Sequence, residues 1–221
     1  MKKLLKLIAI NLYLFLFFVL PAHAQEKVSF YNLRIQTGDL IFVGAKQDQL
    51  SGAINRVTQR EENASFDHVG IIEVSETGIY ILHASPEKGS VREPLDSLVN
   101  QSKSKNKKLA VYRLAKEVQP SISGAIISAK TLLGKPYNWS YVLNDTSLYC
   151  SDFVERAFRD AKIFELEPMT FKDPKTGEID TYWAEFYTKL GMEVPEGKAG
   201  CNPNGLAGSR HLVRLGKLYE K

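Results

Sequence analysis

The strongest constraint on the fold is a pair of apolar runs joined by a short polar stretch. "HVGIIEV" (68–74) and "IYILHA" (79–84) are rich in Ile and Val, and "SETG" between them has the composition of a turn. This pattern predicts an antiparallel hairpin. A four-residue turn pairs Val74 with Ile79. The same register then places Gly70 opposite His83.

This register predicts a pair of histidines on one face of the hairpin. Side chains alternate along a strand, so His68, Gly70 and His83 share a face. The histidines become diagonal neighbours roughly 7–8 Å apart at Cα, and Gly70 leaves the space between the rings open. One histidine in a strand is ordinarily a half-buried structural residue. Of the three histidines after residue 24, however, two lie on this face, which favours a functional pair.

The remaining segments predict a mixture of helices and strands. Strands are expected at 37–44 and 109–114, an edge strand or turn at "VREPL" (91–95), and helices at 47–59, 121–134, from 151 onward and around 181–191. The basic stretch 101–108 and the Gly- and Pro-rich stretches 171–180 and 195–208 are expected to be loops. Because helices and strands do not alternate regularly, the predicted class is α+β.

The first 24 residues have the pattern of a signal peptide. Lys2, Lys3 and Lys6 precede an apolar run over 7–20, and Ala-His-Ala ends the segment at 24. A membrane anchor is the alternative, but the run is shorter than the roughly 18–20 residues that span a bilayer. The sequence therefore predicts cleavage near Ala24–Gln25 and export to the periplasm or beyond. Residues 25–221 are expected to form one domain without a transmembrane span.

Charge and motifs exclude several classes of function. The formal net charge is +4, and the three lysines of the leader account for all but +1 of it. A near-neutral chain gives no reason to expect nucleic-acid binding. Neither a Gly-rich phosphate loop nor a dinucleotide fingerprint occurs, so no cofactor is predicted.

The sequence leaves several roles open for the two cysteines. In an exported chain Cys150 and Cys201 can form a disulfide. In "SLYCSDFVERAF" (147–158), however, Cys150 stands where a loop enters a helix. The positive end of a helix lowers the pKa of a thiol and favours the nucleophilic thiolate. His68 as base and His83 as its orienting partner would complete a catalytic triad. A zinc site is disfavoured, because spacings of 15 and 67 residues match no compact ligand pattern.

Five motifs in order resemble one family of enzymes. "GDLIF", "DHVGII", "YILHASP", "GKPYNW" and "YCSDFV" resemble the permuted papain-like cysteine hydrolases of the YiiX/YebB-like group. That group is similar to the NlpC-type cell-wall peptidases and to lecithin retinol acyltransferase. The resemblance implies an antiparallel sheet or partial barrel packed against a nucleophile-bearing helix. It places the nucleophile at Cys150, the base at His68 and the third polar residue at His83. YiiX-like members often carry Glu at this third position, whereas the acyltransferase-like branch uses His.

The predicted function is an exported amidase or peptidase with a Cys-His-His triad. The resemblance and the leader together suggest peptidoglycan stem peptides, small peptides or N-acyl amides as substrates. Two alternatives remain: a lipid esterase or acyltransferase, and a secreted binding module without catalytic activity. The sequence does not predict an oligomeric state.

Further residues are predicted to complete the site. The backbone N–H of Cys150 is one expected donor to the oxyanion, and the second is expected near Gly38 or Asp39, at the start of a strand. Tyr137, Trp139 and Tyr149 flank the cysteine in the sequence and are expected to line the substrate pocket. Their alternative role is that of ordinary aromatic core.

Overall fold

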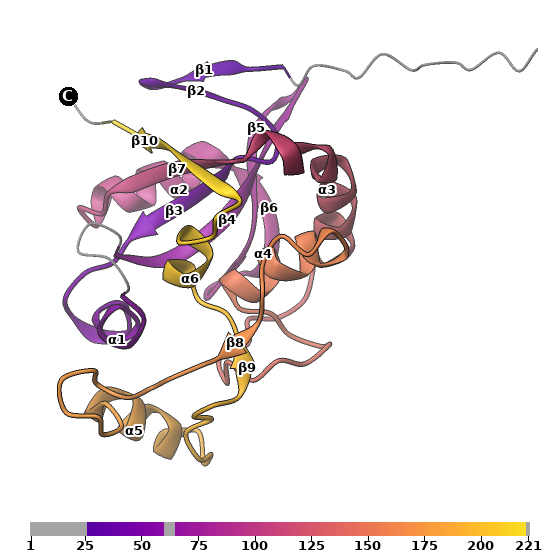
Figure 1. Ribbon diagram of the computed structural model, residues 1–221. Coiled ribbons are helices and arrows are strands. Elements are labelled where there is room, and N and C mark those ends of the chain that lie inside the picture. The colour runs from indigo at the N-terminus through magenta and orange to yellow at the C-terminus, as the bar shows by residue number, and fades with distance from the viewer. Residues whose placement is uncertain (1–25, 60–64, 220–221) are drawn as a thin grey trace, which may run out of the picture.

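A six-stranded antiparallel sheet lies at the centre of the computed structural model, which describes residues 26–59 and 65–219 (Figure 1). The predicted leader, 1–24, lies outside the described residues. The strand order is β10-β7-β3-β4-β5-β6. The strands are β3 (Leu40–Gly44), β4 (Phe66–Ser75), β5 (Gly78–Ser85), β6 (Gly89–Pro94), β7 (Leu109–Leu114) and β10 (Leu212–Lys217). Two small two-stranded sheets are formed by β1 (Val28–Phe30) with β2 (Leu33–Ile35), and by β8 (Glu167–Pro168) with β9 (Ala199–Gly200).

The hairpin predicted from the sequence is formed by β4 and β5 in the predicted register. Val74 pairs with Ile79, and Ile71 pairs with Leu82. The strands extend one residue further than expected at the turn, because Ser75 also pairs with Gly78. The connection is therefore a two-residue turn rather than a four-residue one, which leaves the register unchanged.

Each face of the sheet buries its own set of side chains. Leu40 and Phe42 of β3 belong to one apolar cluster, and Ile41 and Val43 to the other, as the alternation along a strand requires. The first cluster includes side chains from α1 (Gln49–Thr58), α3 (Ile122–Thr131), α4 (Cys150–Phe158), α5 (Thr181–Lys189) and α6 (Pro203–Ala207). The second includes α2 (Leu95–Ser104) and the β1–β2 hairpin. Two short 3-10 helices, Lys116–Ser121 and Arg159–Ala161, precede α3 and follow α4.

Two stretches expected to be loops contain helices. α2 covers the first part of 101–108, and Leu95, Leu98, Val99 and Ser102 form its buried stripe. Leu95, Leu98 and Val99 precede the lysines of 101–108, and the composition of that later stretch is what suggested a loop. In the second stretch, α6 begins after Asn202, whose side chain accepts a hydrogen bond from the N–H of Gly205. In the described residues no helix is both long and apolar enough to cross a membrane.

Candidate active site

The hairpin brings the two predicted histidines into direct contact. Nε2 of His68 lies 2.7 Å from Nδ1 of His83, and the rings meet edge to face. Gly70 is required on this face, because a Cβ at that position would lie 2.5 Å from Cδ1 of Ile81 and 2.9 Å from the Cβ of His83. The predicted shared face of His68, Gly70 and His83 is therefore confirmed. Their catalytic roles remain predictions.

A third polar residue, absent from the sequence prediction, joins this pair. Oε1 of Glu93 lies 3.0 Å from Nε2 of His83, and the carboxylate also forms an ion pair with Lys88. The contacts with His83 and Lys88 lower the pKa of Glu93 to about 2, against partial burial. Sequence reasoning treated the segment around Glu93 as an edge or turn. The available signal was its alternation, since β6 pairs His83 with Val91 and so places Glu93 diagonally next to His83.

Cys150 is the first residue of α4 and lies beside the residues on either side of His68. The backbone N–H of Val69 stabilises a charge on its sulfur, and the carboxylate of Asp67 acts against one. Asp67 and Cys150 also line the same cavity. The hydrogen bonds found among the described residues do not include one between Cys150 and His68. The contact of His68 with His83 uses Nε2, so Nδ1 is the ring nitrogen of His68 that this contact leaves open.

The protonation of the site differs from the sequence prediction. Burial raises the pKa of the Cys150 thiol to about 12, despite the N–H groups of Val69, Ser151 and Cys150 itself. Burial also lowers the pKa of His68 well below its usual value, and the nearby charges of His83 and Lys107 add to this. At neutral pH both groups are therefore uncharged. The predicted resting thiolate is wrong, because loss of hydration outweighs the stabilisation at the helix start.

A cavity of about 570 Å³ opens next to the cysteine. Ring and aliphatic side chains form one part of its wall, and charged or titratable groups are contributed by Asp67, Lys162, Glu165, Glu167, Arg210 and His211. The apolar side chains lining it are Ile54, Val57, Tyr137, Tyr141, Tyr149, Ile163, Phe164, Pro168, Met169, Phe171, Trp183, Pro203 and Leu206. Tyr137 and Tyr149 thus lie where they were predicted. Trp139 does not line the cavity; it is 42% exposed and packs against the ring of Tyr137.

The oxyanion donor predicted near Gly38 and Asp39 is not supported. Asp39 is fully buried in an ion pair with Arg113, and it also accepts a hydrogen bond from the N–H of Gln36. Gly38 lies against Ile122, and neither it nor Asp39 lines the cavity at Cys150. Both residues serve the turn into β3, so the strand start predicted to approach the substrate packs into the core.

The fold and this arrangement of residues match a known family. A family model described as the permuted papain-like amidases, YaeF/YiiX, C92 family, matches residues 34–216. The chain belongs to this family. The match covers every strand of the central sheet except the last residue of β10. The predicted resemblance and the predicted fold, an antiparallel sheet packed against the helix that carries Cys150, are both confirmed.

Two relatives of this C92 chain come from Escherichia coli. The uncharacterized protein YiiX of strain K12 is 24% identical over 192 residues, which are 83% of this chain and 87% of the relative. A crystal structure from strain O157:H7, described as the metalloprotein YiiX of DUF1105, has a TM-score of 0.64. It is 23% identical, and the match covers 84% of this chain and 98% of that one. The similarity to this solved structure shows that the two chains share a fold.

The described part of this C92 chain does not fit a resident metal ion. Within 26–59 and 65–219, no three His, Cys, Asp or Glu side chains are grouped so that they could hold one. His68, His83 and Glu93 instead form a line in which each residue contacts the next. A metal site needs its ligands around one point, which this line does not provide.

Cys201 is a free, buried thiol, and Cys150 is also free, so the two do not form a disulfide. The N–H of Cys201 donates to Oη of Tyr149 over 3.2 Å, and Oγ of Ser151 donates to its carbonyl over 3.0 Å. Cys201 also lines the cavity. Cys201 does lie in a loop, between β9 and α6, but it is buried, since the residues on both sides of Cys150 pack against it.

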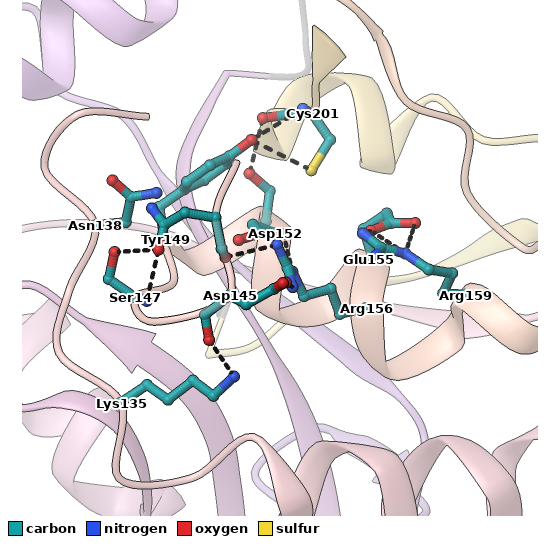
Figure 2. A network of polar contacts seen from close by, with 12 residues as sticks. Lys135, Asn138, Asp145, Ser147, Tyr149, Asp152, Glu155, Arg156, Arg159 and Cys201 are labelled. Carbon is teal, nitrogen blue, oxygen red and sulfur yellow. Dashed lines mark hydrogen bonds and ion pairs between the residues drawn. The ribbon is translucent and has the colours of Figure 1, made fainter. Parts of the chain in front are cut away.

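A charged network holds the start of α4 in place (Figure 2). Arg156 contacts Asp152 one turn earlier, 2.7 Å away, and reaches Asp145 and the carbonyl of Asn144 in the preceding loop. Burial raises the pKa of Asp152 to about 6 although Arg156 opposes this. Arg156 thereby ties the helix to the loop that leads into Cys150.

Proposed function

We propose that the protein is an exported cysteine amidase that hydrolyses amides carrying an apolar acyl group. The observation that supports this most strongly is the position of Cys150. It starts a helix, lines a cavity with apolar and charged walls, and lies close to Asp67 and Val69, the two chain neighbours of His68. Membership of the amidase family gives the reaction class, and the predicted leader supports export.

The proposed reaction begins with a neutral thiol and a neutral imidazole. As the sulfur of Cys150 bonds to the amide carbon, Nδ1 of His68 takes the thiol proton. The carbonyl π electrons move to oxygen. When the tetrahedral intermediate collapses, the C–N bond breaks and His68 returns the proton to the leaving amine. Water then attacks the thioester, with His68 as base, and releases the acid.

Two donors are proposed for the oxyanion. The first is the backbone N–H of Cys150, at the start of α4. The second is the hydroxyl of Tyr137, which lines the cavity near Cys150. Burial raises the pKa of Tyr137 well above its usual value, and a negative charge on Cys150 would raise it further. The phenol therefore stays protonated and can donate.

The cavity suits a substrate with an apolar acyl group and a polar remainder. Its charged side chains, which include Lys162, Glu165 and Arg210, can pair with polar groups that would otherwise be costly to bury. An acyl chain matches the ring-lined part of the wall. Transfer of the acyl group to an alcohol rather than to water is a second candidate reaction, because the same cavity would hold a lipid acyl chain.

The test compares three substrates with purified protein: a medium-chain N-acyl aminomethylcoumarin amide, the matching acetyl amide and a stem tetrapeptide. Faster cleavage of the medium-chain amide, abolished in folded Cys150→Ser, is expected. Intact-mass analysis should then detect the acyl adduct on Cys150. Cleavage of the stem peptide alone would contradict the proposed substrate, and cleavage that persists in Cys150→Ser would contradict the nucleophile.

A further inference from the structure

We propose that Glu93 is a positioning residue that sets which nitrogen of His68 carries the proton, acting through His83. Nothing in the triad inferred from the sequence or in the family assignment includes this carboxylate. The inference deepens the proposed function and rests on it, since it concerns the same base. Its structural basis is the continuous line from His68 through His83 to Glu93.

The three side chains are placed by three adjacent strands. His68 lies on β4, His83 on β5 and Glu93 on β6, and both contacts have hydrogen-bond length, 2.7 Å and 3.0 Å. His83 is 2% exposed and the Glu93 side chain 14% exposed. Buried polar groups such as these are normally hydrogen-bonded, so the direction of each bond has to satisfy both partners.

The carboxylate of Glu93 determines which atom is the donor in both hydrogen bonds of this line. Glu93 is ionised near neutral pH and can only accept a hydrogen bond, so Nε2 of His83 must carry a proton. The 2.7 Å contact between Nδ1 of His83 and Nε2 of His68 then holds a single proton. We assign this proton to Nε2 of His68, which leaves the lone pair of His68 on Nδ1, the nitrogen proposed to deprotonate the thiol.

Glu93 also stabilises the cation formed during attack. When the S–H bond breaks and the proton moves to Nδ1, His68 becomes an imidazolium in a buried site. Lys107 opposes this charge, as does His83 when it is protonated, and Glu93 favours it. On the other side of the thiol, Asp67 opposes the thiolate. Lys88 pairs with Glu93 and reduces the effect of its negative charge on the two rings.

Two substitutions should therefore shift the pKa of His68 in opposite directions. In Glu93→Gln the side-chain NH₂ must either lie next to Lys88 or donate a hydrogen bond to His83. The second orientation reverses both histidine tautomers and protonates Nδ1 of His68. Loss of the charge also lowers the pKa of His68. Lys88→Met keeps the carboxylate and removes its cation, so it raises the pKa of His68. Lys88 is 55% exposed, which makes this change mild for the fold.

The experiment measures kcat/KM of the acyl amide against pH, and the ¹⁵N NMR signals of labelled histidine. The fall of kcat/KM toward low pH, its acid limb, reports the pKa of the essential base in the free enzyme. Glu93→Gln should lower kcat/KM by about 10- to 100-fold, the usual effect of losing a partner that orients a histidine. It should also move the acid limb to lower pH and shift the His68 proton toward Nδ1. Lys88→Met should move the acid limb to higher pH and keep the proton on Nε2.

Glu73→Gln is the matched control. Glu73 is also a buried carboxylate of the sheet with two cationic partners, Arg92 and Lys130, but it does not contact the histidines. This variant should lose stability without changing the His68 tautomer or the acid limb. The proposal is overturned if folded Glu93→Gln keeps the wild-type tautomer, or if Lys88→Met leaves the acid limb in place. The NMR result needs no turnover, so an inactive wild type would contradict only the proposed amidase function.

Discussion

The protonation of each reacting residue in this site is set by a balance between burial and local polar partners. Cys150 has a helix start and several N–H groups that favour its thiolate, yet burial raises its pKa to about 12. The charged form loses hydration that the nearby dipoles only partly replace. The nucleophile is therefore formed during attack, by transfer of the proton to His68, rather than stored as a resting ion pair.

This balance predicts how Cys150 reacts with iodoacetamide. The alkylation rate should rise from pH 7 through pH 9 without a plateau, because a free thiol titrates near pH 8.5 and this one above it. Cys201→Ser leaves Cys150 as the sole cysteine of the chain, so the label can be assigned. A rate that is already constant below pH 7 would show a resting thiolate and contradict the burial argument.

At the scale of one element, α4 depends on the pairing of Asp152 with Arg156. The Asp152 side chain is fully buried and that of Arg156 is 11% exposed. A buried pair adds little net stability, but removal of one partner leaves an uncompensated charge in the core. Because Arg156 also holds the loop before Cys150, this pair links the stability of the helix to the position of the nucleophile.

Arg156→Met should therefore destabilise the protein by about 3–5 kcal/mol at pH 8. The loss should shrink as the pH falls from 8 to 5, because Asp152 then takes up a proton and no longer carries a charge. This protonation begins above pH 6 in the variant, because Arg156 no longer lowers the pKa of Asp152. Urea denaturation at pH 8 and at pH 5 measures this.

Arg159→Met, one turn later, is the control for this helix. Arg159 is 45% exposed in its pair with Glu155, so water can screen the remaining charge and a loss of about 1 kcal/mol or less is expected. Figure 2 shows both pairs on α4. Equal losses for the two variants, independent of pH, would contradict the role given to burial at Asp152.

At the scale of the molecule, the cavity is assembled from segments far apart in the chain. Its wall combines α1, the loop before α4 and the region from 162 to 211, which includes α5 and α6. Trp183 of α5 connects several of these parts. Its Nε1–H donates to the carbonyl of Ala53 in α1, and its ring packs edge to face on Tyr141 and Phe171.

Trp183→Ala should cost about 3–5 kcal/mol of stability and widen the cavity. If the acyl chain of the substrate occupies this space, the preference should shift toward longer chains. The ratio of kcat/KM for two acyl lengths measures this, corrected for the folded fraction. Tyr182→Ala is the control, since the ring of Tyr182 packs edge to face on Trp183 without lining the cavity. A chain-length preference that does not change in Trp183→Ala would place the acyl group elsewhere.

Much of the central architecture follows from local patterns in the sequence. The β4–β5 register follows from the period of two and a short turn, both of which act over a few residues, and it correctly placed His68 beside His83. The start of α4 at Cys150 was also readable, because the apolar stripe of a helix repeats every three to four residues. α2 was missed, since its apolar residues Leu95, Leu98 and Val99 make only a short stripe, which ends before the polar, basic stretch 101–108 begins.

Contacts between distant segments were decided by the tertiary structure alone. Glu93 joins the histidines only because β6 pairs with β5, and the pairing of one strand with another is not encoded in either strand by itself. The protonation of Cys150 was predicted wrongly for a related reason. A helix start is a local feature, whereas burial depends on every segment packed around the thiol, and here burial is the larger effect.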